Sequence, residues 1–299
     1  MTIMFDVFFK SVCQGGQVKV GIIPVNVGVE SVEQIIGIAK LAESLNYESV
    51  WTFEHVIVPV DYDSKYPYNT TGKMGVPPET NLVDPLIALT AIAAVTQEIR
   101  LGTGVNILSQ VNPLYMAKQA ASLDFISNGR FMLGVGIGWL REEFEALGVP
   151  FERRGARFDD YVEGMRKIWS EEVVEHESDF ISWHGFKSYP LPIQNPFPVV
   201  MGGVKGKIFE RTAKLGNGWF APTGDPEELK GHLEKLQKEC DQIGRDMSEI
   251  EITCMWPGQG GQEFLEELSS VGVDRVVVPS MGAADPTEQL QKIAEVAIN

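Results

Sequence analysis

Short apolar segments alternate with amphipathic segments along the chain from Val18 to its end. In residues 32–45, the apolar positions 32, 35, 36, 39, 42 and 45 share one helical face, which predicts an amphipathic helix. Further helices are predicted at 83–94, 113–126, 158–169, 205–215, 226–243, 262–271 and 286–297. Between them, short apolar segments predict strands at 18–24, 49–53, 100–105, 131–136, 199–201, 218–220, 250–255 and 275–279.

This strict alternation of strands and helices predicts a parallel sheet in an α/β fold. Eight such units close most simply into a (β/α)8 TIM barrel, and an open doubly wound sheet is the alternative. We expect one barrel domain over residues 18–299. Residues 1–17 are apolar and carry no basic segment or cleavage site of a signal peptide, so we interpret them as an N-terminal extension or an extra strand.

Two connections in this pattern are long. One follows the second strand, from Glu54 to Leu82, and the other follows the fourth strand, over about 171–198. Long loops in a compact domain usually cover or bind something, so we expect two lids. The aromatic residues of these loops suggest an apolar or planar ligand, although they suit an oligomer contact equally well. They are Tyr62, Tyr66, Tyr68, Trp183 and Phe186.

Composition excludes several classes of function. The 299 residues carry a formal net charge of −16, which argues against nucleic acid and against anionic membrane surfaces as partners. No stretch of 18 apolar residues exists, so no membrane span is expected. The three cysteines lack metal-ligand spacing, so we expect no metal site, and their small number suits a reducing cytoplasm.

Chemistry in a barrel lies where the strands end, and these ends carry few titratable groups. Glu54 and His55 are the candidates, and no nucleophile with its base or Schiff-base lysine accompanies them. Instead the end of the fourth strand carries glycine at every second position, at Gly134, Gly136 and Gly138, and Trp139 follows. Trp139 stands where a dinucleotide fingerprint needs glycine. Such a site is typical of a protein whose bound cofactor carries the reaction.

His55 is the candidate for acid–base catalysis because the ordinary pKa of histidine lies near neutrality. The alternative is a histidine that only caps the strand end with a hydrogen bond. After the fifth strand, Gly202, Gly203 and Lys205 precede a predicted helix and form a candidate phosphate site, or else a tight turn. After the third strand, Asn106 is expected to present its amide at the barrel mouth.

Together these motifs resemble the bacterial-luciferase-like superfamily of flavin and deazaflavin enzymes. The resemblance covers nearly the whole chain and rests on Glu54-His55 and on residues 49–51, 100–104, 117–119, 123–124, 127–130, 134–144, 155–161, 201–203 and 216–219. It implies a non-proline cis peptide between Gly104 and Val105 that supports the cofactor ring. It also implies that His55 faces that ring and that the cofactor phosphate lies on Gly202 and Gly203.

Members of this superfamily use either F420 or FMN. Residues 138–144 are similar to the deazaflavin subgroup, which favours F420. Sugar-oxidising members have a glutamate where this chain has Trp139, which argues against a sugar-phosphate substrate. The resemblance also implies a homodimer.

Three hypotheses follow. The first is an F420-dependent oxidoreductase that transfers a hydride to or from a small organic substrate. The second is an FMN-dependent monooxygenase that uses O2 and reduced flavin from a separate reductase. The third is a flavin-binding or deazaflavin-binding protein without turnover.

Overall fold

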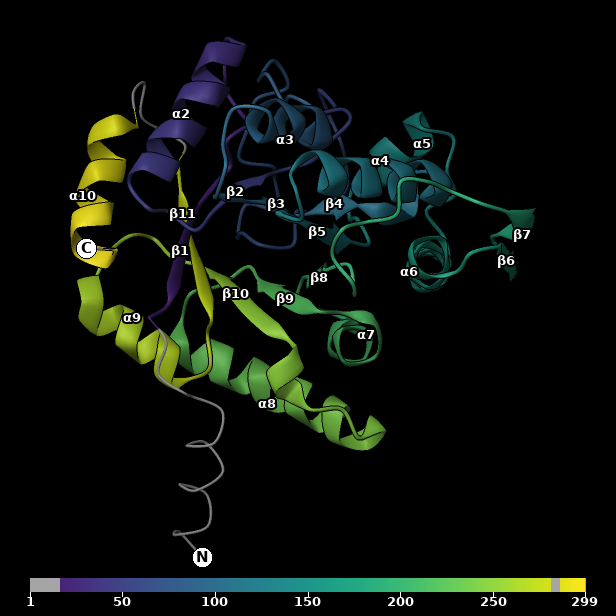
Figure 1. Cartoon of the computed structure of the whole chain (residues 1–299). Coiled ribbons are helices and arrows are strands. Elements are labelled where there is room, and N and C mark those ends of the chain that lie inside the picture. Colours follow the sequence, from purple (N-terminus) through teal and green to yellow (C-terminus); the bar gives the residue numbers. More distant parts are fainter. Residues whose placement is uncertain (1–16, 281–285, 299) are drawn as a thin grey trace, which may run out of the picture.

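A closed barrel of eight parallel strands forms the centre of the computed structural model, which describes residues 17–280 and 286–298 (Figure 1). The strands are β1 (Lys19–Ile23), β2 (Ser49–Thr52), β3 (Arg100–Thr103), β5 (Phe131–Gly136), β8 (Val199–Gly202), β9 (Gly218–Ala221), β10 (Glu251–Met255) and β11 (Arg275–Pro279). Each pairs with its neighbour, and β1 pairs with β11, so the sheet has no open edge among these strands. The predicted TIM barrel is confirmed, and the open sheet is wrong.

Eight helices surround this barrel (Figure 1). They are α2 (Val32–Ser44), α3 (Pro85–Ala93), α4 (Pro113–Ile126), α6 (Arg154–Ser170), α7 (Ile208–Leu215), α8 (Pro226–Ile243), α9 (Gly261–Ser270) and α10 (Thr287–Ala297). Helix α7 begins three residues after its predicted start, because Gly206 has a positive φ angle that a helix does not tolerate. Within the described residues, no helix is both long and apolar enough to cross a membrane.

Several short elements lie between these strands and helices. They are β4 (Asn106–Ile107), the 3-10 helices Leu108–Gln110 and Met247–Glu249, α5 (Arg141–Ala146), β6 (Val174–Glu177) and β7 (Ser182–Phe186). The predicted N-terminal extension 1–17 lies, apart from Gln17, outside the described residues.

The second long connection does not form a lid, so that expectation is wrong. It folds into the β6–β7 hairpin, which lies beside α6 on the outside of the barrel (Figure 1). Nε2 of His176 on this hairpin lies 2.7 Å from Oδ1 of Asp160 on α6, and the Trp183 ring covers Gly164 of the same helix. The aromatic residues of the hairpin therefore pack against a helix.

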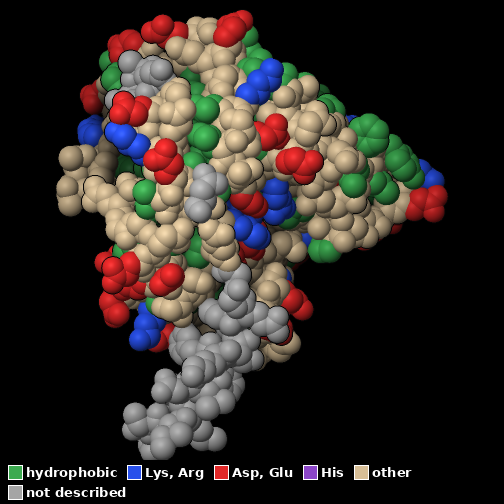
Figure 2. Space-filling view, turned by 60° about the vertical axis from the view of Figure 1, so that its left-hand side comes forward, with side chains coloured by type: hydrophobic (Ala, Val, Ile, Leu, Met, Phe, Trp, Pro, Cys, Tyr) green, Lys and Arg blue, Asp and Glu red, His purple; other side chains and the backbone are tan. Residues whose placement is uncertain are grey.

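An ion network closes the end of the barrel where the strands begin. The fully buried Arg275 guanidinium donates to both carboxylate oxygens of Glu48 and of Glu251, at 2.6–3.0 Å. All three residues lie at the amino ends of strands. On the face shown in Figure 2, basic side chains form only small groups among scattered acidic ones, as the net charge of −16 leads one to expect.

Candidate functional site

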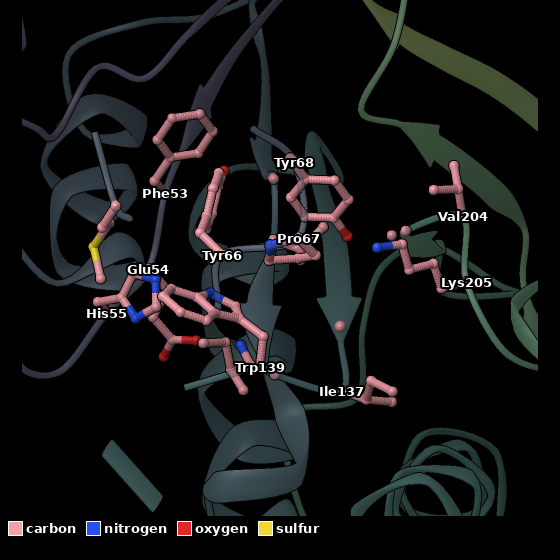
Figure 3. A pocket seen from close by; sticks show the side chains of 18 of the residues that line it. Phe53, Glu54, His55, Tyr66, Pro67, Tyr68, Ile137, Trp139, Val204 and Lys205 are labelled. Atoms are coloured by element: carbon pink, nitrogen blue, oxygen red, sulfur yellow. The ribbon is translucent and has the colours of Figure 1, made fainter. Parts of the chain in front are cut away.

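A cavity of about 500 Å3 lies at the opposite end of the barrel, where the strands end (Figure 3). This volume is in the range of small-molecule and cofactor pockets. The first long connection, the ends of β3, β5 and β8, and helices α6 and α7 all contribute to its wall. Nine of the ten predicted site residues line it: His55, Gly104, Val105, Gly136, Gly138, Trp139, Gly202, Gly203 and Lys205.

Val105 explains why glycine stands at several of these positions. The Gly104–Val105 peptide is cis, as the resemblance implies, and the Val105 side chain lies across the neighbouring strands. A Cβ atom on Gly136 would lie 2.8 Å from Cγ2 of Val105, and one on Gly202 would lie 2.7 Å from its Cγ1. These glycines therefore make room for Val105, which forms the floor of the cavity. This packing requires no anion beside their N–H groups.

Asn106 is the tenth predicted residue, and the expectation that it faces the barrel mouth is wrong. It is buried and does not line the cavity, because side chains alternate along the strand and Val105 already points to that side. Its Oδ1 atom has no hydrogen-bond partner among the described residues.

His55 is held by a carboxylate that the sequence analysis did not identify. Its Nδ1 atom lies 2.9 Å from Oε2 of Glu143, a fully buried residue of α5. The other oxygen of Glu143 accepts a hydrogen bond of 2.6 Å from the backbone N–H of Val56. Because a carboxylate accepts hydrogen bonds, this contact places the proton on Nδ1 and leaves Nε2 for exchange with a ligand.

Glu54 adds a second carboxyl group to the wall of the cavity. It is 9% exposed, and its Oε2 accepts a hydrogen bond from the backbone N–H of Ile107. Burial, with a smaller contribution from the charge of Glu143, raises the pKa of Glu54 from about 4.5 to about 8. Glu54 is therefore neutral at pH 7 and can donate a proton. Its place directly before His55 was the signal in the sequence.

Aromatic rings from the first long connection surround Trp139. Tyr66 and Tyr62 meet the indole nearly edge-on, with ring centroids 5.2 and 5.9 Å away, and His55 does so from another side at 5.9 Å. Tyr68 packs against Tyr66 at 5.5 Å. This connection therefore covers the cavity, as its length predicted, and Figure 3 shows Tyr66 and Tyr68 above Trp139.

Helix α5 also anchors this cover. Glu142 accepts hydrogen bonds from the backbone N–H groups of Asp63 at 2.8 Å and of Ser64 at 3.2 Å. Burial alone would raise the pKa of Glu142, but hydrogen bonds, including those from Ser64 and Asp63, outweigh it and lower this pKa to about 2. The two neighbouring glutamates thus hold the cover and His55 in place.

Positive charge gathers at the opposite end of the cavity. Lys205, shortly after Gly202 and Gly203, lines it, as do Arg211 of α7 and Arg154 of α6. Arg211 is paired with Asp159, and Arg154 donates to the carbonyl of Gly138 at 3.2 Å. In Figure 3, Lys205 and the hydroxyl of Tyr68 extend toward each other. The part of the cavity at Gly203 and Lys205 is its cationic end, and the aromatic rings extend from Trp139 to this end through Tyr68.

Comparison with known proteins agrees with this architecture. A family model described as luciferase-like monooxygenase matches residues 4–257. An uncharacterised protein of Mycobacterium tuberculosis is 30% identical over 262 residues, which cover 86% of this chain and 91% of that protein.

Two solved structures share the fold. Monooxygenase RslO1 from Streptomyces bottropensis matches with a TM-score of 0.72 and 23% identity over 93% of this chain and 97% of that one. The coenzyme F420-dependent tetrahydromethanopterin reductase from Methanopyrus kandleri matches with a TM-score of 0.74 and 18% identity over 95% and 99%. The family match spans most of the chain, and the chain therefore belongs to the luciferase-like monooxygenase family.

Proposed function

We propose that this protein is an F420-dependent oxidoreductase that transfers a hydride to or from a small organic substrate. The observation that carries the proposal is the pairing of His55 with the buried Glu143 at the edge of a cavity whose floor is Val105. Such a site positions a cofactor and a proton donor but offers no protein nucleophile of its own. The similarity of residues 138–144 to the deazaflavin subgroup supports F420 over FMN.

The residues of the cavity fit a planar ring with an anionic tail. Val105 would support the ring, and the absence of side chains on Gly136 and Gly202 makes room for the Val105 side chain beneath it. Gly203 and Lys205 would bind the phosphate at the cationic end. Gly104, Gly138 and Trp139 would border the ring. The bound cofactor supplies the carbon that gives or accepts the hydride.

The protein's own contribution is proton transfer and exclusion of water. Nε2 of His55 would give a proton to, or take one from, a substrate oxygen or nitrogen, while Glu143 stabilises the charged imidazole. Glu54, neutral at pH 7, would add a hydrogen-bond donor to the same region. The aromatic cover would select an apolar, planar substrate and keep water from the reacting atoms.

An FMN-dependent monooxygenase supplied by a separate reductase is the second candidate. The match of residues 4–257 to the family model described as luciferase-like monooxygenase supports it. Consumption of O2 by the protein with added reduced FMN tests it directly. The third candidate, a binding protein without turnover, is tested by His55→Ala, because an unchanged rate in a turnover assay excludes catalysis by His55.

We also propose a homodimer in a reducing cytoplasm, with a separate flavin or F420 reductase as a partner. The two described cysteines, Cys240 and Cys254, are buried free thiols, which supports a reducing compartment. Light scattering on the purified protein tests the oligomeric state.

A further inference from the structure

Trp219 joins the outer layer of the barrel to the turn at the cationic end of the cavity. Its side chain is fully buried, and its indole Nε1–H donates a hydrogen bond of 2.8 Å to the carbonyl oxygen of Gly203. The ring packs against Phe209 of α7 at 5.4 Å and against His232 of α8 at 5.9 Å. Trp219 therefore lies outside the cavity, between the strands and the helices.

This hydrogen bond fixes the direction of the peptide between Gly203 and Val204. That peptide is trans, so its N–H points away from its carbonyl. Because the carbonyl of Gly203 points toward Trp219, the N–H of Val204 points away from Trp219. Gly203 and Val204 both line the cavity, whereas Trp219 does not. No acceptor among the described residues takes a hydrogen bond from this N–H. The φ of Gly203 is +115°, which suits glycine alone.

We infer that Trp219 is a positioning residue that turns the Val204 N–H into the cavity to bind the anionic tail of the ligand. The inference rests on the proposed function, since it concerns the same phosphate site. It gives a role to the segment 216–219 that carries part of the family resemblance. Asn217 and Trp219 share one face of the chain, and Asn217 Oδ1 accepts from Val199 N–H at 3.2 Å. Asn217 thus binds the start of β8, and Trp219 binds the residue that follows its end.

The test compares ligands that differ only in the anionic tail. FMN and riboflavin form one pair, and F420 and the same deazaflavin without its phosphodiester tail form the other. Fluorescence titration gives, for each pair, the ratio of the affinity for the ligand with the tail to the affinity for the ligand without it. This ratio is compared between the wild-type protein and Trp219→Phe, which keeps an aromatic ring but loses the donor. We expect the ratio to fall about fivefold, the usual effect of one lost hydrogen bond, with little change for the tailless ligands.

Trp169→Phe is the matched control. Trp169 is also a buried tryptophan whose Nε1–H donates to a backbone carbonyl, that of Ala117 at 3.1 Å, but it lies between α4 and α6. Its ratio should equal that of the wild type. Phe209→Leu disturbs the packing of the Trp219 ring without removing the donor, and should also keep the ratio.

Gly203→Ala provides an independent route if Trp219→Phe fails to fold. An added Cβ cannot keep the φ of +115° without strain, so the same peptide must turn and the ratio should fall. The inference is wrong if the wild-type protein prefers the phosphorylated ligand and Trp219→Phe, or Gly203→Ala in its place, keeps that preference. It is also wrong if Phe209→Leu lowers the ratio as much. A wild-type protein with no preference in either pair instead refutes the proposed phosphate site, and the inference with it.

Discussion

Nδ1 of His55 lies 2.9 Å from Oε2 of Glu143, although the two residues are 88 positions apart in the sequence. His55 follows β2, and Glu143 lies in the short helix after β5, so the barrel brings them together. Glu143 orients the imidazole and leaves Nε2 for the ligand.

Loss of either member of this pair should reduce turnover. We expect His55→Ala to lower kcat about 100- to 10,000-fold, since it removes the proton donor. Glu143→Gln should lower kcat about 10- to 100-fold, since the amide stabilises the charged imidazole less. Glu145→Gln, an exposed neighbour on the same helix, is the control and should match the wild type. Equal rates for Glu143→Gln and Glu145→Gln would contradict the role of the pair.

Glu54 predicts a specific dependence of stability on pH. Its pKa is about 8 in the folded protein and near 4.5 when exposed, so unfolding releases a proton between these values. The free energy of unfolding should therefore fall as pH rises from about 4.5 to 8, by at most about 5 kcal/mol at about 1.4 kcal/mol per pKa unit.

The neutral variant Glu54→Gln isolates this effect. At pH 5 both proteins are uncharged at this position and should have similar Tm values. At pH 8.5 the variant should melt at the higher temperature, because only the wild-type protein buries a charge there. A Tm difference that stays constant between pH 5 and 8.5 would show that Glu54 ionises normally.

The packing of Val105 against glycine predicts a compensating pair of substitutions. Gly202→Ala places a Cβ 2.7 Å from Val105 Cγ1, which should cost about 1–3 kcal/mol of unfolding free energy. Val105→Ala in the same chain should recover most of this loss. Gly37→Ala is the control, because that site on α2 has open space around it. Additive effects of Gly202→Ala and Val105→Ala in denaturant unfolding would contradict the proposed contact.

The ion network at the other end of the barrel should matter for stability rather than turnover. Arg275→Met leaves the carboxylates of Glu48 and Glu251 without their buried partner, and we expect a loss of about 3–5 kcal/mol in denaturant unfolding. Lys19→Met removes an ion pair of Glu251 whose lysine is 44% exposed, and should change stability by less than about 1 kcal/mol. Similar losses for both variants would argue against this account.

The sequence was sufficient to predict the barrel, because each strand and each long helix carries its own periodic pattern. It did not predict that Glu143, in the charged segment after β5, lies beside His55, because only the fold brings these two residues together. It also misplaced Asn106, because the pattern does not show which of the alternating side chains after β3 face the cavity, and the structure gives that side to Val105 and Ile107. The role of Trp219 likewise depends on a contact with Gly203, 16 residues away, that no local pattern encodes.

The central claim is that the cavity binds F420, and a fluorescence titration of the purified protein with F420 and FMN side by side tests it most directly. We predict saturable binding of F420 that is tighter than that of FMN and weakened by Lys205→Ala. Tighter binding of FMN would support the oxygen-using alternative. Binding of neither cofactor would contradict the account of the cavity as a whole.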